Sequence, residues 1–104
     1  MSLWFMSIVE INKERIIALC TKHKVYKLFV FGSVLTNDFK SFSDIDFIVD
    51  FSDMELYNYA DNYFEFKESL EKLLERPIDL LEDVALKNPY LRKSIDASKQ
   101  LIYR

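Results

Sequence analysis

The sequence has few of the residues that build flexible loops, cross-links and zinc sites. Its 104 residues include one glycine, one cysteine and one histidine. Cys20 has no partner for an internal disulfide, and Cys20 and His23 alone cannot supply the ligands of a structural zinc site. These absences exclude a disulfide-stabilised scaffold and a zinc-finger fold, and they favour a reducing compartment.

Long apolar runs and an excess of positive charge are also missing. The apolar run near the N-terminus, from Leu3 to Met6, is far shorter than a membrane span or the core of a signal peptide. With 14 basic and 17 acidic residues the net charge is -3, which argues against charge-driven binding to DNA or RNA. We therefore expect a cytoplasmic protein that binds neither membranes nor nucleic acid directly.

The residues that are present suffice for one folded domain. Half of them are apolar, 15% are aromatic and 30% are charged, a composition that supports a hydrophobic core and excludes a disordered tail. A length of 104 residues fits one domain rather than two. We expect a single domain over residues 1–104.

The hydrophobic pattern predicts helices and strands in a defined order. The expected elements are an amphipathic helix over residues 8–23, a buried strand over 25–31, a turn and loop over 33–43, a strand over 44–51, a helix from 53 to about 75, a short strand over 78–81, a helix over 90–98 and an extended segment over 99–103. The long helix carries an apolar stripe of Leu56, Ala60, Tyr63, Leu70 and Leu74. This order predicts an α+β fold in which helices pack on a small mixed β-sheet.

The single glycine lies where the first strand ends. Gly32 allows the backbone to approach a ligand closely, and Ser33 adds a hydroxyl and an N–H at the start of a helical turn, an arrangement that binds phosphate oxygens. The structural alternative is a left-handed turn at Gly32 and a helix cap at Ser33.

Two aspartates lie at the start of the second strand. Asp44 and Asp46 are two residues apart, so their side chains point to the same side of a strand. The two negative charges repel each other unless a cation lies between them, and oxygen ligands suit Mg²⁺ or Mn²⁺. The alternative is a solvated strand face with two unrelated carboxylates.

A third aspartate interrupts the short apolar strand near residue 80. Asp79 would be costly there unless it faces a cleft, a cation or a partner. If this strand lies beside the 44–51 strand, Asp79 completes a carboxylate triad with Asp44 and Asp46. Such a triad suits metal-dependent phosphoryl or nucleotidyl transfer, whereas an edge-strand aspartate facing water is the alternative.

Together the three motifs resemble those of the minimal nucleotidyltransferases of the DNA polymerase beta superfamily. The resemblance is carried by Phe31-Gly32-Ser33, by Asp44-Ile45-Asp46-Phe47-Ile48-Val49 and by Pro77-Ile78-Asp79-Leu80-Leu81, and it covers most of the chain. It implies the fold of the polymerase beta catalytic core. It also implies that Gly32 and Ser33 hold the triphosphate of ATP, and that Asp44, Asp46 and Asp79 bind two Mg²⁺ ions, with Asp79 helping to activate the attacking hydroxyl.

The sequence departs from this family at one position. Many relatives carry an arginine shortly after Gly-Ser, whereas here the corresponding residues are Val34 to Asn37. Lys40 offers a point charge nearby but lacks the planar fork with which arginine binds phosphate.

The resemblance also implies a partner. Small members of the family resemble antitoxins that transfer AMP from ATP to a tyrosine of an all-helical HEPN ribonuclease toxin, and this is the leading hypothesis. A non-catalytic module that neutralises a helical partner by contact is the alternative. A small-molecule transferase of the aminoglycoside-modifying kind is a third hypothesis, and it would need an additional helical domain.

Overall fold

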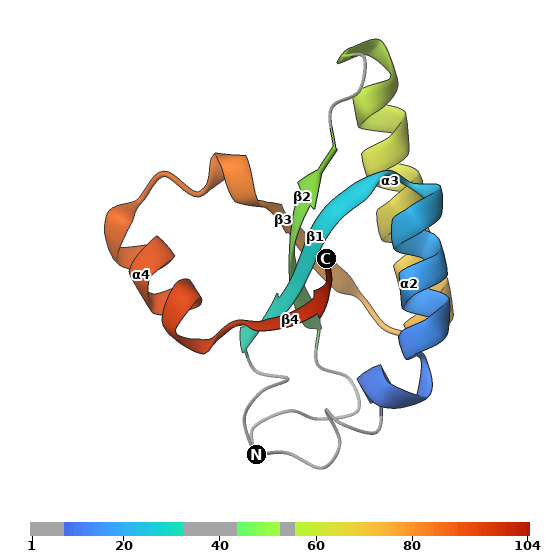
Figure 1. Ribbon diagram of the computed structural model, residues 1–104, viewed down its shortest axis with the longest axis horizontal. Coiled ribbons are helices and arrows are strands. Elements are labelled where there is room, and N and C mark those ends of the chain that lie inside the picture. Colours follow the sequence, from blue (N-terminus) through green and yellow to red (C-terminus); the bar gives the residue numbers. More distant parts are fainter. Residues whose placement is uncertain (1–7, 33–43, 53–55) are drawn as a thin grey trace.

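The computed structural model describes residues 8–32, 44–52 and 56–104 (Figure 1). Its elements are α2 (Lys13–Lys22), β1 (Val25–Phe31), β2 (Ile45–Phe51), α3 (Leu56–Leu74), β3 (Ile78–Glu82), η2 (Asp83–Ala85), α4 (Pro89–Ser98) and β4 (Gln100–Tyr103). The expected strands and helices are thus present. The expected turn and loop over 33–43, with Ser33 and Lys40, lie outside the described residues.

Two local features differ from the sequence-based expectation. The helix expected over residues 8–23 is interrupted at Asn12, whose side chain donates to the carbonyl of Ile8 (2.9 Å). Asparagine competes in this way with the helical hydrogen bonds of the backbone. The short 3-10 helix η2 was not expected, because three residues are too few to show a hydrophobic period.

The strands form one mixed sheet in the order β3-β2-β1-β4. β1 pairs antiparallel with both β2 and β4, whereas β2 and β3 are parallel. The parallel pair requires a crossover connection, and α3 provides it. The expected α+β fold, a small mixed sheet packed by helices, is confirmed.

The main core lies between the sheet and the helices α2 and α3, which cover one of its faces (Figure 1). The fully buried side chains in this layer include Ile16, Leu28, Phe47, Phe66 and Leu70. The expected stripe of α3 is wrong at Ala60, which is exposed, while Phe66 takes a central place in the core. A large ring buries more apolar surface than a methyl group, so packing favours Phe66. No described helix is long and apolar enough to cross a membrane.

The ends of α2 and α3 adopt the left-handed conformation without glycine. Lys24 and Glu75 follow these helices with φ values of 59° and 55°. Such positions are usually glycine, because L-residues are strained there. The one glycine of the chain is instead Gly32, at the end of β1.

Candidate functional site

The side of the sheet opposite α2 and α3 carries both charged and apolar side chains. We call this side the α4 face, because α4 and η2 lie on it (Figure 1). Its side chains come from alternate residues of paired strands: Lys27, Phe29 and Phe31 of β1, Asp46, Ile48 and Asp50 of β2, and Asp79 and Leu81 of β3. Residues directly opposite each other in adjacent strands share a face, so the register itself assembles this surface.

Asp46 and Asp79 are brought together by the parallel pairing of β2 and β3. They are direct partners in the register, and Phe31 of β1 is the partner of Asp46 on its other side. Asp46 is half-buried and Asp79 is exposed. The sheet therefore places two carboxylates side by side at one end of the α4 face.

Gly32 lies against the Asp46 carboxylate. Its φ of 83° is in the left-handed region, and a Cβ atom added at this position would overlap the carboxylate of Asp46. Both the conformation and the space require glycine. The backbone at the end of β1 thus approaches the Asp46 carboxylate more closely than a residue with a Cβ atom would allow.

The strand that carries Asp79 is held from its free edge by two side chains of α3. The Tyr63 hydroxyl donates to the carbonyl oxygen of Leu80 (2.5 Å), and a carboxylate oxygen of Glu71 accepts from the backbone N–H of Ile78 (3.3 Å). These backbone groups flank Asp79. Because they point away from β2, they would otherwise be unpaired at the edge of the sheet.

The Tyr63 hydroxyl donates its hydrogen bond from a half-buried position. Burial raises the pKa of Tyr63, and the negative charges of Glu82 and Asp79 raise it further. No feature of the sequence indicated this role, because Tyr63 belongs to the apolar stripe of α3. Only the tertiary structure shows that its hydroxyl reaches β3.

Asp46 lies in an unfavourable electrostatic environment. Burial, followed by the negative charges of Asp79 and Asp44, raises the pKa of Asp46 to about 6. The ion pairs between Lys72 and Glu68, Arg92 and Asp83, and Lys99 and Asp96 do not involve these carboxylates. A divalent cation between the carboxylates would reverse this unfavourable interaction.

The oxygen ligands of the pair suit Mg²⁺, although they do not make a complete site. Within the described residues, no three acidic, histidine or cysteine side chains come together as a metal-binding set. Asp44 is exposed just before β2. Because Mg²⁺ usually takes one or two carboxylates and completes its shell with water and substrate phosphate, Asp46 and Asp79 fit such an ion.

The structure brings together some of the site residues predicted from the sequence, but not all of them. Asp46, Asp79 and Gly32 lie together, Asp44 influences Asp46 through its charge, and Ser33 is outside the described residues. The geometry is that of a two-carboxylate site beside a glycine turn, which suits phosphoryl or nucleotidyl transfer with a divalent cation.

Comparison with known proteins adds an independent finding. Residues 13–102 match the model of the nucleotidyltransferase domain family. A proposed protein adenylyltransferase of Methanocaldococcus jannaschii is 35% identical over 96 residues, which span 92% of this chain and 93% of the relative.

Solved structures share the fold. One described as a minimal nucleotidyltransferase has a TM-score of 0.75 at 25% identity, covering 91% of this chain and 93% of its own. Another belongs to the complex of a tri-AMPylated HEPN toxin with an MNT antitoxin from Shewanella oneidensis. Its TM-score is 0.61 at 20% identity, with 89% of this chain and 70% of that chain covered.

Proposed function

Because the chain belongs to the nucleotidyltransferase domain family and is a nucleotidyltransferase, we propose that it transfers AMP from ATP to a tyrosine of a HEPN-type toxin. In this role it acts as the antitoxin of the pair. The observation that carries the proposal is the in-register pair of Asp46 and Asp79 beside Gly32.

The reaction is an in-line displacement at the α-phosphorus of ATP. The tyrosine oxygen forms a bond to phosphorus, and the bond from phosphorus to the oxygen that bridges to the β-phosphate breaks. Pyrophosphate leaves with the electron pair, and the hydroxyl proton passes to a carboxylate oxygen of Asp79. No covalent enzyme intermediate is required.

Different residues of the site bind the triphosphate and the metal ions. Gly32 and Ser33 bind the triphosphate through backbone N–H groups and a hydroxyl. Asp44, Asp46 and Asp79 would hold two Mg²⁺ ions, which would neutralise negative charge on the triphosphate. The pKa of Asp46, raised by burial and further by the charges of Asp79 and Asp44, supports this assignment, because a bound cation would offset both effects.

The choice of a protein acceptor rests on the relatives. The M. jannaschii relative is named for transfer to proteins, and a structural neighbour belongs to an antitoxin complex with an AMPylated HEPN toxin. The chain itself consists of one sheet with its helices, and the described residues include no further layer that would close over a small acceptor. An acceptor presented by a partner protein fits this architecture.

Intact-mass spectrometry of a co-expressed HEPN-type partner tests the proposal. After incubation with ATP and Mg²⁺, we expect the partner to gain the mass of one or more AMP units with the wild-type protein. With Asp46→Asn the rate of this gain falls by at least about a thousandfold, because a carboxylate ligand of the divalent cation is lost.

Asp61→Asn is the matched control, because Asp61 is an exposed residue of α3, on the other side of the sheet. This variant should modify the partner at the wild-type rate. Absence of any mass gain with the wild type, while a stable complex still forms, would replace the proposal by the non-catalytic binding module.

A further inference from the structure

Helix α4 packs on the rest of the fold through very little of its surface. Among its ten residues, all of which the structure describes, Ile95 is the only buried one. A cavity of about 190 Å³ lies between α4 and the sheet, lined by Lys27 and Asp50 of the strands and by Arg92 and Lys99. A helix of this length is marginal in water by itself, because packing normally supplies its stability. A protein surface that packs on α4 would therefore stabilise it.

Three large apolar side chains are exposed in η2 and in the first turn of α4. Val84 is 69% exposed, Tyr90 is 84% exposed and Leu91 is 47% exposed, and we call these three residues the α4 patch. Scattered apolar residues are common on a protein surface, whereas apolar side chains that gather in one short segment are typical of an interaction surface.

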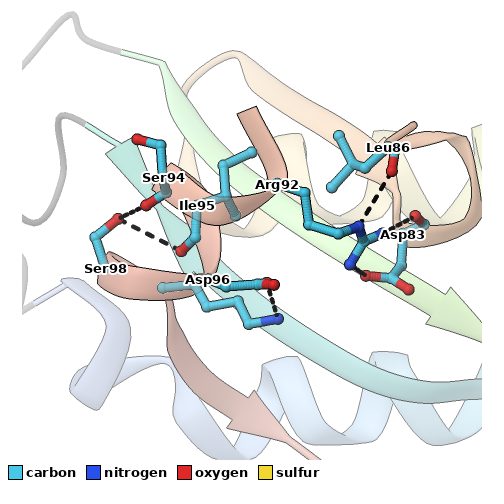
Figure 2. A network of polar contacts seen from close by, with 8 residues as sticks. Asp83, Leu86, Arg92, Ser94, Ile95, Asp96 and Ser98 are labelled. Carbon is cyan, nitrogen blue, oxygen red and sulfur yellow. Dashed lines mark hydrogen bonds and ion pairs between the residues drawn. The ribbon is translucent and has the colours of Figure 1, made fainter. Parts of the chain in front are cut away.

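The α4 patch is held in place by side chains that join η2 to α4. Arg92 donates to Asp83 Oδ1 (3.3 Å), to the carbonyl of Asp83 (2.7 Å) and to the carbonyl of Leu86 (3.1 Å), as Figure 2 shows. The Asn88 side chain caps the helix by accepting from the backbone N–H groups of both α4 residues of the patch (2.9 and 3.1 Å). A surface that is ordered in this way loses less conformational entropy when it binds.

The segment that carries the α4 patch is positively charged. Residues 84–95 include Lys87, Arg92 and Lys93 but no aspartate or glutamate, although the whole chain has a net charge of -3. Lys87 and Lys93 are exposed, while Arg92 is used in the bridge to Asp83. The first turn of α4 has no acidic residue, although the helix dipole favours one there. The charge of this surface therefore complements an acidic partner.

A partner protein fits these features better than a second copy of the chain or a nucleic acid. A two-fold contact between copies would bring two positively charged surfaces together. A nucleic acid would pair its phosphates with the lysines but would leave the apolar side chains of the patch without a counterpart. An acidic protein surface with an apolar centre complements both the charge and the exposed apolar groups.

We propose that the α4 patch docks the HEPN-type partner through an acidic surface of that protein with an apolar centre. Because η2 and α4 lie on the same side of the sheet as Asp46 and Asp79, a partner bound there can present its tyrosine to the carboxylate pair (Figure 1). The proposal rests on the proposed function, which supplies the partner. It assigns recognition of the partner to η2 and α4 rather than to α2 and α3.

Calorimetric titration of the protein with the purified HEPN-type partner tests the docking surface. We expect Tyr90→Ala to weaken binding about thirtyfold, the effect of truncating an aromatic side chain at the centre of an interface. Lys93→Glu should weaken binding about tenfold at about 0.15 M salt, because it places a negative charge opposite an acidic surface. This second loss should shrink at about 1 M salt, which screens surface charges.

Phe64→Ala and Lys13→Glu are the matched controls. Phe64 is an exposed ring of α3 and Lys13 is an exposed lysine of α2, so both lie on the helices that cover the other face of the sheet. These two variants should bind the partner with wild-type affinity. All four variants should give the circular dichroism spectrum of the wild type, because each substituted side chain is exposed.

Binding and AMP transfer together identify which proposal fails. Wild-type affinity in both Tyr90→Ala and Lys93→Glu overturns the docking surface, while AMP transfer to the partner upholds the proposed function. Weakened binding in both variants, with no transfer by the wild type, supports the docking surface and overturns the proposed transfer. A wild type that does not bind the partner overturns both.

Sedimentation velocity tests the other occupants of the α4 patch. The wild type alone should be monomeric and should not bind a fluorescent RNA oligonucleotide. Self-association or RNA binding that Tyr90→Ala abolishes would assign the patch to a second copy or to a nucleic acid, and either result would overturn the proposal.

Discussion

The two faces of the sheet use the same strands for opposite purposes. On the face covered by α2 and α3, alternate residues such as Leu28, Phe47 and Leu80 are almost completely buried in the core. On the α4 face, Asp46 and Asp79, the immediate neighbours of Phe47 and Leu80, form a pair of carboxylates. Adjacent residues of one strand thus serve stability and chemistry separately, because the side-chain period of a strand is two.

The largest expected effect concerns the covered face. Phe47→Ala should destabilise the protein by about 3–5 kcal/mol, because it removes a fully buried ring and leaves a cavity. Urea unfolding followed by circular dichroism measures the change. Phe64→Ala is the matched control, since Phe64 is 62% exposed on α3 and its loss should change stability by less than about 0.5 kcal/mol. Equal losses of unfolding free energy in the two variants would contradict the placement of the core on the face covered by α2 and α3.

On the α4 face, removing a charge should increase stability. The pKa of Asp46 is raised to about 6 in the folded protein, above the value of about 3.9 for an unfolded aspartate. The ionised carboxylate therefore opposes folding, and wild-type stability should fall as pH rises from about 4 to about 6. Since Asp46 stays partly solvated, Asp46→Asn should gain about 1 kcal/mol at pH 7 in metal-free buffer.

Thermal unfolding of both proteins between pH 4 and pH 7 in EDTA measures this gain. The difference should disappear at the acidic end, and Mg²⁺ should stabilise the wild type but not the variant. A gain that is the same at every pH would be inconsistent with titration of Asp46. Asp61→Asn, on the opposite side of the sheet, should show no such pH dependence.

A smaller and local loss of stability is expected at the edge strand β3. Tyr63→Phe removes the hydrogen bond to Leu80 and should cost about 1 kcal/mol. Amide hydrogen exchange should accelerate in β3 more than in β1, because β3 is held at its free edge by α3. Tyr90→Phe is the control, since Tyr90 is 84% exposed. Uniform acceleration over the whole sheet would contradict a local role for Tyr63.

Several elements of the fold could be read from local sequence alone. The strand over 25–31 matches β1, and Pro89 begins α4 as its fixed φ favours at the first turn of a helix. The long helix was expected from its apolar period, yet the choice of Phe66 over Ala60 for the core depended on how α3 packs. Periodicity identifies a helix more reliably than it identifies the centre of the buried face.

Some residues of the candidate site were likewise predicted from the sequence, whereas others were found only in the structure. Gly32, Asp46 and Asp79 were singled out because a lone glycine and charges within strands are unusual. Tyr63 and Glu71 were missed, because their roles depend on which backbone groups of β3 face the edge of the sheet. Lys27 and Asp50 were not expected to line one cavity, since they come from different strands and meet only through the register.

The amino-acid sequence was sufficient to predict where the strands lie, which of their residues alternate between apolar and charged, and where a glycine allows a turn with positive φ. These are local properties, set by side-chain period and backbone sterics. Tertiary contacts set the register of β2 and β3 that joins Asp46 to Asp79, and they bring Arg92 and Lys99 to the same cavity as Lys27 and Asp50. Such contacts join distant residues, and the packing of the whole core selects them.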